Sequence, residues 1–174
     1  AEGEVVYTDG GILAEFAWVL VVLPFVAALM ITFIGKSLPM KGAEIALGTI
    51  GIIFVYSVAL MFLHITQGIA NEFFVNVGSI GQFDIEFGWV VDGLSIMMYF
   101  VVGLVALLVF IYATNYMEGE IRYTFFFTSL TLFAGSMLVL VSSPTLIQIL
   151  IGWELVGVCS YLLIGHYWEI KDNS

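Results

Sequence analysis

Charged residues are scarce in this sequence. They make up 10% of its 174 residues and only 4 are basic, whereas 61% of the chain is hydrophobic and the mean hydropathy is +1.11. Because soluble domains contain about 25% charged residues, this composition indicates an integral membrane protein. The basic residues are also too few to follow a phosphate backbone, which excludes nucleic-acid binding.

Cysteine is nearly absent, since Cys159 is the only one. An intrachain disulfide is therefore excluded, and no set of residues has metal-ligand spacing. The sequence also contains no phosphate loop, dinucleotide fingerprint, haem-binding pair or nucleophile–histidine arrangement. We therefore expect no metal site, no bound cofactor and no redox active site in this chain.

Long hydrophobic runs occupy most of the sequence. Each is long enough to cross a hydrocarbon core of about 30 Å at a rise of about 1.5 Å per residue. Pro24, in the middle of the first run, is expected to kink its helix, which neighbouring helices tolerate in a membrane. The 5 predicted spans cover approximately residues 15–34, 44–63, 89–113, 123–141 and 145–168.

Residues 65–88, between the second and third runs, have a different pattern. Within 82–87, aromatic or aliphatic residues alternate with polar or acidic ones, which is the period of a half-buried strand. We predict a β-hairpin over about 72–87 on the membrane surface, with its acidic face in water and its aromatic face on helix ends. The predicted fold is an all-α integral membrane protein with 5 transmembrane helices and a β-hairpin between helices two and three.

The basic residues predict a topology. Lys36, Lys41, Arg122 and Lys171 are all the basic residues of the chain, and they fall in the segments after spans one, three and five. These segments share one side of the membrane. The positive-inside rule therefore places the tail (residues 1–13) and the hairpin outside and the C-terminus in the cytoplasm.

Glu154 is the main candidate site residue. It lies roughly 13–15 Å into the last predicted helix, near the bilayer centre, where a charged side chain costs about 2.5–3.5 kcal/mol or more. One interpretation is a packing acid between helices, and the other is a proton or ion path. Tyr161 is a candidate hydrogen-bonding neighbour. Helical spacing places on or near the Glu154 face Leu150, Ile151, Gly157, Val158 and Tyr161.

Asp92 is a weaker candidate, near the outer boundary of the third span. A carboxylate there is favoured by the free N–H groups and the dipole of a helix N-terminus, and this interpretation is preferred to a transport role. Trp89 and Trp168 are well placed to be interface anchors. In the fourth span a stripe of small and polar residues predicts close helix packing, and it comprises Ser129, Thr131, Gly135 and Ser136.

Three segments are recognisable. Residues 92–95, 111–117 and 152–165 read DGLS, IYATNYM and GWELVGVCSYLLIG. Through them the chain resembles the N-terminal third of subunit 5, the largest antiporter-like subunit of respiratory complex I, and its counterparts in photosynthetic complex I and in multisubunit sodium/proton antiporters. Residues 14–174 would then be the N-terminal five-helix part of an antiporter-like membrane domain.

The resemblance implies a role in proton translocation. In this family, a glutamate at the position of Glu154 pairs with a lysine on a later, broken helix and modulates the proton affinity of that lysine. The chain would then belong to a proton-pumping NADH-quinone oxidoreductase, a translocase whose flavin and iron–sulfur clusters are in other subunits. Its expected partners are the other membrane and peripheral subunits, the remaining part of the antiporter-like subunit and the lipid bilayer. The expected location is an energy-transducing membrane such as the bacterial plasma membrane.

Two positions depart from the family pattern. A histidine common near the end of the third span is Phe110 here, and a basic residue common at the start of the fourth is Phe125, with Arg122 nearby. Two alternatives stay open. One is the large subunit of a multisubunit sodium/proton antiporter, and the other is a structural membrane subunit in which Glu154 is a packing acid.

Overall fold

The computed structural model describes residues 11–80, 83–120 and 122–165. Its elements follow the predicted runs closely. In chain order they are α1 (Gly11–Glu15), α2 (Trp18–Ile34), the 3-10 helix η1 (Gly35–Ser37), α3 (Ala43–Gln67), β1 (Asn71–Ile80), β2 (Phe83–Val91), α4 (Gly93–Tyr116), α5 (Tyr123–Ser142) and α6 (Leu146–Ile164).

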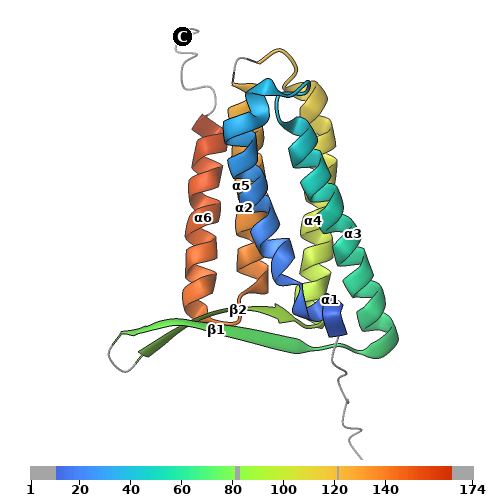
Figure 1. Ribbon diagram of the computed structural model, residues 1–174, viewed down its shortest axis with the longest axis vertical. Coiled ribbons are helices and arrows are strands. Elements are labelled where there is room, and N and C mark those ends of the chain that lie inside the picture. Colours follow the sequence, from blue (N-terminus) through green and yellow to red (C-terminus); the bar gives the residue numbers. More distant parts are fainter. Residues whose placement is uncertain (1–10, 81–82, 121, 166–174) are drawn as a thin grey trace, which may run out of the picture.

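The helices α2 to α6 form an up-and-down bundle, and the β-hairpin lies across one end of it (Figure 1). In the described part of the chain, 5 helices are long and apolar enough to cross a membrane. This confirms the predicted multi-pass membrane protein with a hairpin between spans two and three. The first span begins at Trp18 rather than at residue 15, because a turn at Phe16 and Ala17 separates α1 from α2.

The third span also begins later than predicted. Trp89 lies in β2 and not in a helix, because it pairs with Phe73 of β1 and stacks on its ring with centroids 5.1 Å apart. The helix starts only after Asp92, whose carboxylate accepts a hydrogen bond from the Ser95 amide. The prediction that the third span begins at Trp89 was wrong, since the residue belongs to the hairpin, and its role as an interface anchor stays a prediction.

The centre of the bundle is α5, which contacts the other four long helices and β2. Ser129, Thr131 and Ser136 of the predicted small-and-polar stripe are almost completely buried. Each hydroxyl donates to a carbonyl oxygen one turn earlier in α5, at 2.7 to 3.0 Å. The stripe therefore satisfies its own polar groups, and the prediction of close packing is confirmed.

Two glycines show how closely the helices approach. A Cβ added at Gly135 would lie 3.0 Å from the Cβ of Pro24, so α5 fits against the proline of α2. A Cβ added at Gly152 would lie 3.0 Å from the Cα of Leu140, so α6 touches the backbone of α5. Such small-residue contacts replace the hydrophobic effect as the source of helix association in lipid.

The hairpin turns one of its faces toward the helices. β1 and β2 are antiparallel, with Phe73 opposite Trp89 and Val75 opposite Phe87. Val75, Phe87 and Trp89 line a groove that they share with α2, α5 and α6. This confirms that the aromatic face packs on helix ends, although part of residues 82–87, where the alternation was seen, is outside the described residues.

Gln148 fastens the hairpin to α6. Its buried side-chain amide accepts from the Gly88 N–H and donates to the Gly88 carbonyl, both at 2.9 Å. Next to it, the Thr145 hydroxyl donates to the Glu86 carbonyl at 3.2 Å. A Cβ at position 88 would lie only 2.0 Å from the Phe73 carbonyl oxygen, so glycine is required there.

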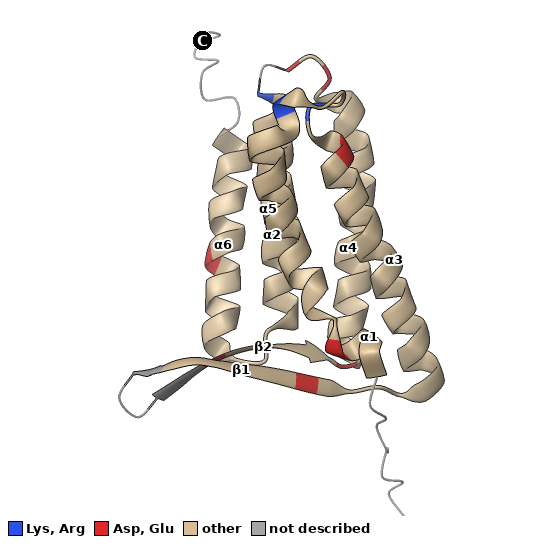
Figure 2. Cartoon of the chain, viewed as in Figure 1, with Lys and Arg blue, Asp and Glu red and all other residues tan. Residues whose placement is uncertain are grey.

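The described basic residues gather at one end of the bundle. Lys36, Lys41 and Arg122 lie at the end opposite the hairpin (Figure 2), while Lys171 is outside the described residues. In the described part of the chain, the hairpin end therefore carries acidic residues and no lysine or arginine. This is the distribution on which the topology prediction depends.

We predict that Gln148→Leu lowers the free energy of unfolding by about 2 kcal/mol or more, because it leaves the N–H and C=O of Gly88 unpaired, at about 1–3 kcal/mol each. The measurement is the midpoint of SDS-induced unfolding in mixed micelles. Thr66→Val is the matched control, since the Thr66 hydroxyl bonds only to its own helix. Equal midpoints for the two variants would contradict the role of Gln148.

Candidate functional site

The candidate site lies on α6, the helix at the edge of the bundle. The Thr145 hydroxyl caps the N-terminus of α6 by accepting a hydrogen bond from the backbone N–H of Gln148. Among the described helices, α6 packs mainly on α5. Gln148, Gly152 and Cys159 form the buried side of α6. Most of the remaining surface of the helix faces away from the bundle.

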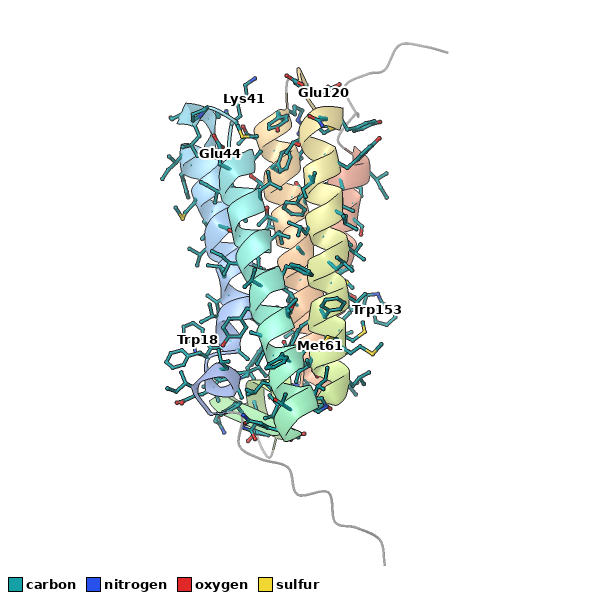
Figure 3. The ribbon with its side chains drawn as sticks, turned by 90° about the vertical axis from the view of Figure 1, so that its right-hand side faces the viewer. Trp18, Lys41, Glu44, Met61, Glu120 and Trp153 are labelled. Atoms are coloured by element: carbon teal, nitrogen blue, oxygen red, sulfur yellow. The ribbon has the colours of Figure 1, made fainter. Side chains whose placement is uncertain are left out.

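Glu154 lies on this outward surface. It is exposed, and so are all the residues that helical spacing placed on its face. Val158 is 55% exposed and Tyr161 76% exposed, and the neighbouring Trp153 is 68% exposed and stands off the side of the bundle (Figure 3). The result is a broad apolar surface with one carboxylate near its middle. The exposed large side chains of this surface are Leu146, Ile147, Leu150, Ile151, Trp153, Val158, Tyr161 and Ile164.

The surroundings of Glu154 are open. Among the described residues it makes no hydrogen bond and no ion pair. Apart from its chain neighbours and the nearby backbone of its own helix, nothing lies within 4 Å of where a Cβ of Gly157 would be. Glu154 follows the start of α6 by about 12 Å of helix. The described basic residues lie at the far end of the bundle. The site therefore presents a carboxylate and a notch at Gly157, and none of the described residues fills either.

Tyr161 lies about 10 Å further along α6 than Glu154. No hydrogen bond joins the two side chains. Instead, Tyr161 borders a pocket of about 250 Å³ together with Arg122 and Phe125 from the start of α5. The structure thus brings Tyr161 near a guanidinium, and its role beside Glu154 stays a prediction.

Asp92 has the geometry of a helix cap. Its Oδ1 accepts from the Ser95 N–H at 2.7 Å. The imidazole of His64 packs against the next residue, Gly93, where an added Cβ would lie 2.9 Å from Nε2. Its Nδ1 is 2.8 Å from the Ile69 carbonyl oxygen. These contacts join the ends of α3 and α4 at the hairpin side, and they favour the structural interpretation of Asp92.

The two positions that depart from the family pattern are occupied by aromatic packing. Phe110 is 1% exposed and meets the edge of Phe127 with ring centroids 6.1 Å apart. The guanidinium carbon of Arg122 lies 4.6 Å from the centre of the Phe125 ring. Neither phenylalanine can carry a proton, so a relay through these two positions is not available in this chain.

Gln148 and Trp89 were not predicted as site residues. Both border the groove of about 590 Å³ under the hairpin, and the buried Nε1 of Trp89 has no hydrogen-bond partner in the described part of the chain. A glutamine inside an apolar run was the available signal for Gln148. No three His, Cys, Asp or Glu side chains among the described residues are grouped so as to hold a metal ion.

The fold defines the chain as a multi-pass membrane protein with a surface hairpin. A family described as "NADH-Ubiquinone oxidoreductase (complex I), chain 5 N-terminus" matches residues 78–127, which include β2 and α4. By sequence the chain is similar to the N-terminal part of this subunit 5 family of complex I.

Relatives support the assignment over nearly the whole chain. The NAD(P)H-quinone oxidoreductase chain 5 of Synechocystis is 39% identical over 168 residues, which are 92% of this chain and 24% of the relative. The subunit 5 of the Paulinella chromatophora chromatophore is 37% identical over 165 residues, which are 91% of this chain and 25% of the relative. The chloroplastic subunit 5 of Chlorokybus atmophyticus is 35% identical over 161 residues, which are 88% of this chain and 24% of the relative. The chain thus spans about a quarter of the length of these curated relatives.

We predict opposite effects for leucine at two nearby positions of α6. Gly152→Leu places a side chain against the Leu140 backbone and should destabilise the bundle by about 2 kcal/mol or more. Glu154→Leu removes no contact with the described residues and should leave the unfolding midpoint in micelles unchanged or raise it. A marked loss of stability in Glu154→Leu would show that Glu154 supports the packing of this chain.

Proposed function

We propose that this chain forms the N-terminal five-helix part of a proton-translocating membrane subunit of NADH-quinone oxidoreductase, in which Glu154 is the acidic half of a charge pair. The observation that supports this best is the position of Glu154, near the middle of an exposed apolar helix surface. A carboxylate facing lipid at that depth costs several kcal/mol, so the surface favours a protein partner with a base.

The partner of this surface is proposed to be the remaining part of the antiporter-like subunit. Its broken helix would bring a lysine to Glu154, and the notch at Gly157 leaves room for a closely approaching backbone. A carboxylate beside an ammonium stabilises the charged forms of both. Separating the two lowers the proton affinity of the lysine, so that movement of either group can release a proton.

The coupling to electron transfer is proposed from the relatives, which are named as subunits of NAD(P)H-quinone oxidoreductases. Flavin and iron–sulfur clusters would transfer the electrons in other subunits, and this chain would respond through its membrane neighbours. Tyr161, between Glu154 and the basic end of the bundle, is the next protonatable side chain on that surface. The names of these relatives favour complex I over a sodium/proton antiporter.

We predict that Glu154→Gln in the assembled complex keeps subunit composition and quinone reduction by the peripheral arm while proton uptake per electron falls severalfold. Glutamine has nearly the same shape but cannot hold the charge that stabilises the partner base. The measurement is proton uptake in sealed vesicles during NADH oxidation. Glu154→Asp should retain part of the activity, and Asp92→Ala, which removes the α4 cap, should lower stability without changing the proton yield per electron.

Three outcomes would separate the hypotheses. Unchanged proton uptake with normal assembly in Glu154→Gln would contradict the translocation role. Loss of assembly would support the packing acid instead. Co-purification of the chain without flavin and iron–sulfur subunits, in a complex that exchanges sodium for protons, would favour the antiporter.

The proposed orientation has the hairpin outside and the basic end in the cytoplasm, in an energy-transducing membrane such as the bacterial plasma membrane. Cys159, the only cysteine, is 4% exposed, so new cysteines can be labelled above a low background. We predict that a membrane-impermeant maleimide labels Thr66→Cys from the outside and labels Ser37→Cys only after permeabilisation. The reverse pattern would contradict the orientation.

A further inference from the structure

A pocket of about 400 Å³ lies at the end of the bundle opposite the hairpin. Every lysine and arginine of the described residues lines this pocket, and they come from two segments far apart in the sequence (Figure 2). No carboxylate of the described residues lines it. The lining residues are Lys36, Lys41, Arg122, Tyr123, Thr124 and Phe125.

The two segments are held together by specific contacts. The Thr124 hydroxyl donates to the Lys41 carbonyl at 3.0 Å, which ties the turn between α2 and α3 to the start of α5. Lys41 has a φ of 51°, in the left-handed region that a residue with a Cβ rarely adopts. The Arg122 guanidinium carbon lies 4.6 Å from the centre of the Phe125 ring. The turn between α2 and α3 thus positions Lys41, and the Phe125 ring of α5 positions Arg122.

Like charges repel, so the gathering of three cations in one pocket favours binding of an anion. Acidic residues also lie at this end, outside the lining of the pocket. Glu44 accepts hydrogen bonds from the amides of Met40 and Gly42 within the same turn (Figure 3). Glu118 is exposed and borders a neighbouring pocket together with Lys41.

The position of the pocket indicates the source of the anion. It lies where α2 ends and α5 begins, at the boundary of the apolar spans, which is the depth of lipid headgroups. A second pocket shares Arg122 and Phe125 with the first and continues along Leu162 of α6. An acyl chain can lie there while its headgroup meets the cations, and basic pockets between transmembrane helices bind anionic headgroups.

We propose that Lys36, Lys41 and Arg122 form a binding site for the phosphate of an anionic phospholipid. The full chain would be purified in detergent and titrated with short-chain phosphatidylglycerol or phosphatidylcholine, with bound lipid counted by native mass spectrometry. We expect preferential binding of phosphatidylglycerol. The double variant Lys36→Gln/Lys41→Gln should lower its affinity by about fivefold per lysine, in line with the interaction of one basic residue with an anionic membrane surface.

Two controls isolate the charge. Glu118→Gln, on the adjacent loop, should leave the affinity for phosphatidylglycerol unchanged or raise it. Lys36→Arg/Lys41→Arg keeps both charges, should retain binding, and gives a second test if the glutamine variant does not fold. Equal binding of the two lipids, or full binding by the glutamine variant, would overturn the proposal. Complete displacement by inorganic phosphate at equal concentration would assign the site to a free anion and overturn its assignment to lipid.

Discussion

Direct backbone contact along α5 is the constraint on which the rest of the structure depends. In lipid no hydrophobic force draws apolar helices together, so association requires surfaces that fit closely. Gly135 against Pro24 and Gly152 against Leu140 provide this fit on two sides of α5. The buried hydroxyls of Ser129, Thr131 and Ser136 donate to carbonyls of α5 itself, and Ser136 also lies 3.8 Å from the sulfur of Cys159 on α6. With α5 fixed in the centre, α6 occupies the edge and its acidic side faces outward.

Much of this architecture could be predicted from the sequence because it depends on local pattern. Long uncharged runs define the spans, and alternation over a few residues is enough for the hairpin. The face that contains Glu154 follows from helical periodicity, since Leu150, Val158 and Tyr161 are all exposed beside it. Each of these features is decided by residues close together in the chain, together with the thickness of the bilayer.

The features that could not be predicted depend on distant residues. The apolar residues before Asp92 suit either a helix or a strand, and pairing of Trp89 with Phe73 decides for the strand. Gln148 meets Gly88 across 60 positions, and Thr124 meets Lys41 across 83. The periodicity of a single segment cannot predict such contacts, because it carries no information about distant residues. The partner of Glu154 is also beyond local pattern, because nothing in the described residues reaches its carboxylate.

The fit between Pro24 and Gly135 has a consequence for biogenesis. α2 makes its largest helix contact with α5, although α3 and α4 lie between them in the chain. During synthesis α2 therefore enters the membrane without its principal neighbour, which is inserted only after α3 and α4. During this time α5 does not cover the carbonyl oxygen that Pro24 leaves without an amide hydrogen-bond donor. A chaperone or insertase that covers α2 until α5 emerges would shield this carbonyl from lipid.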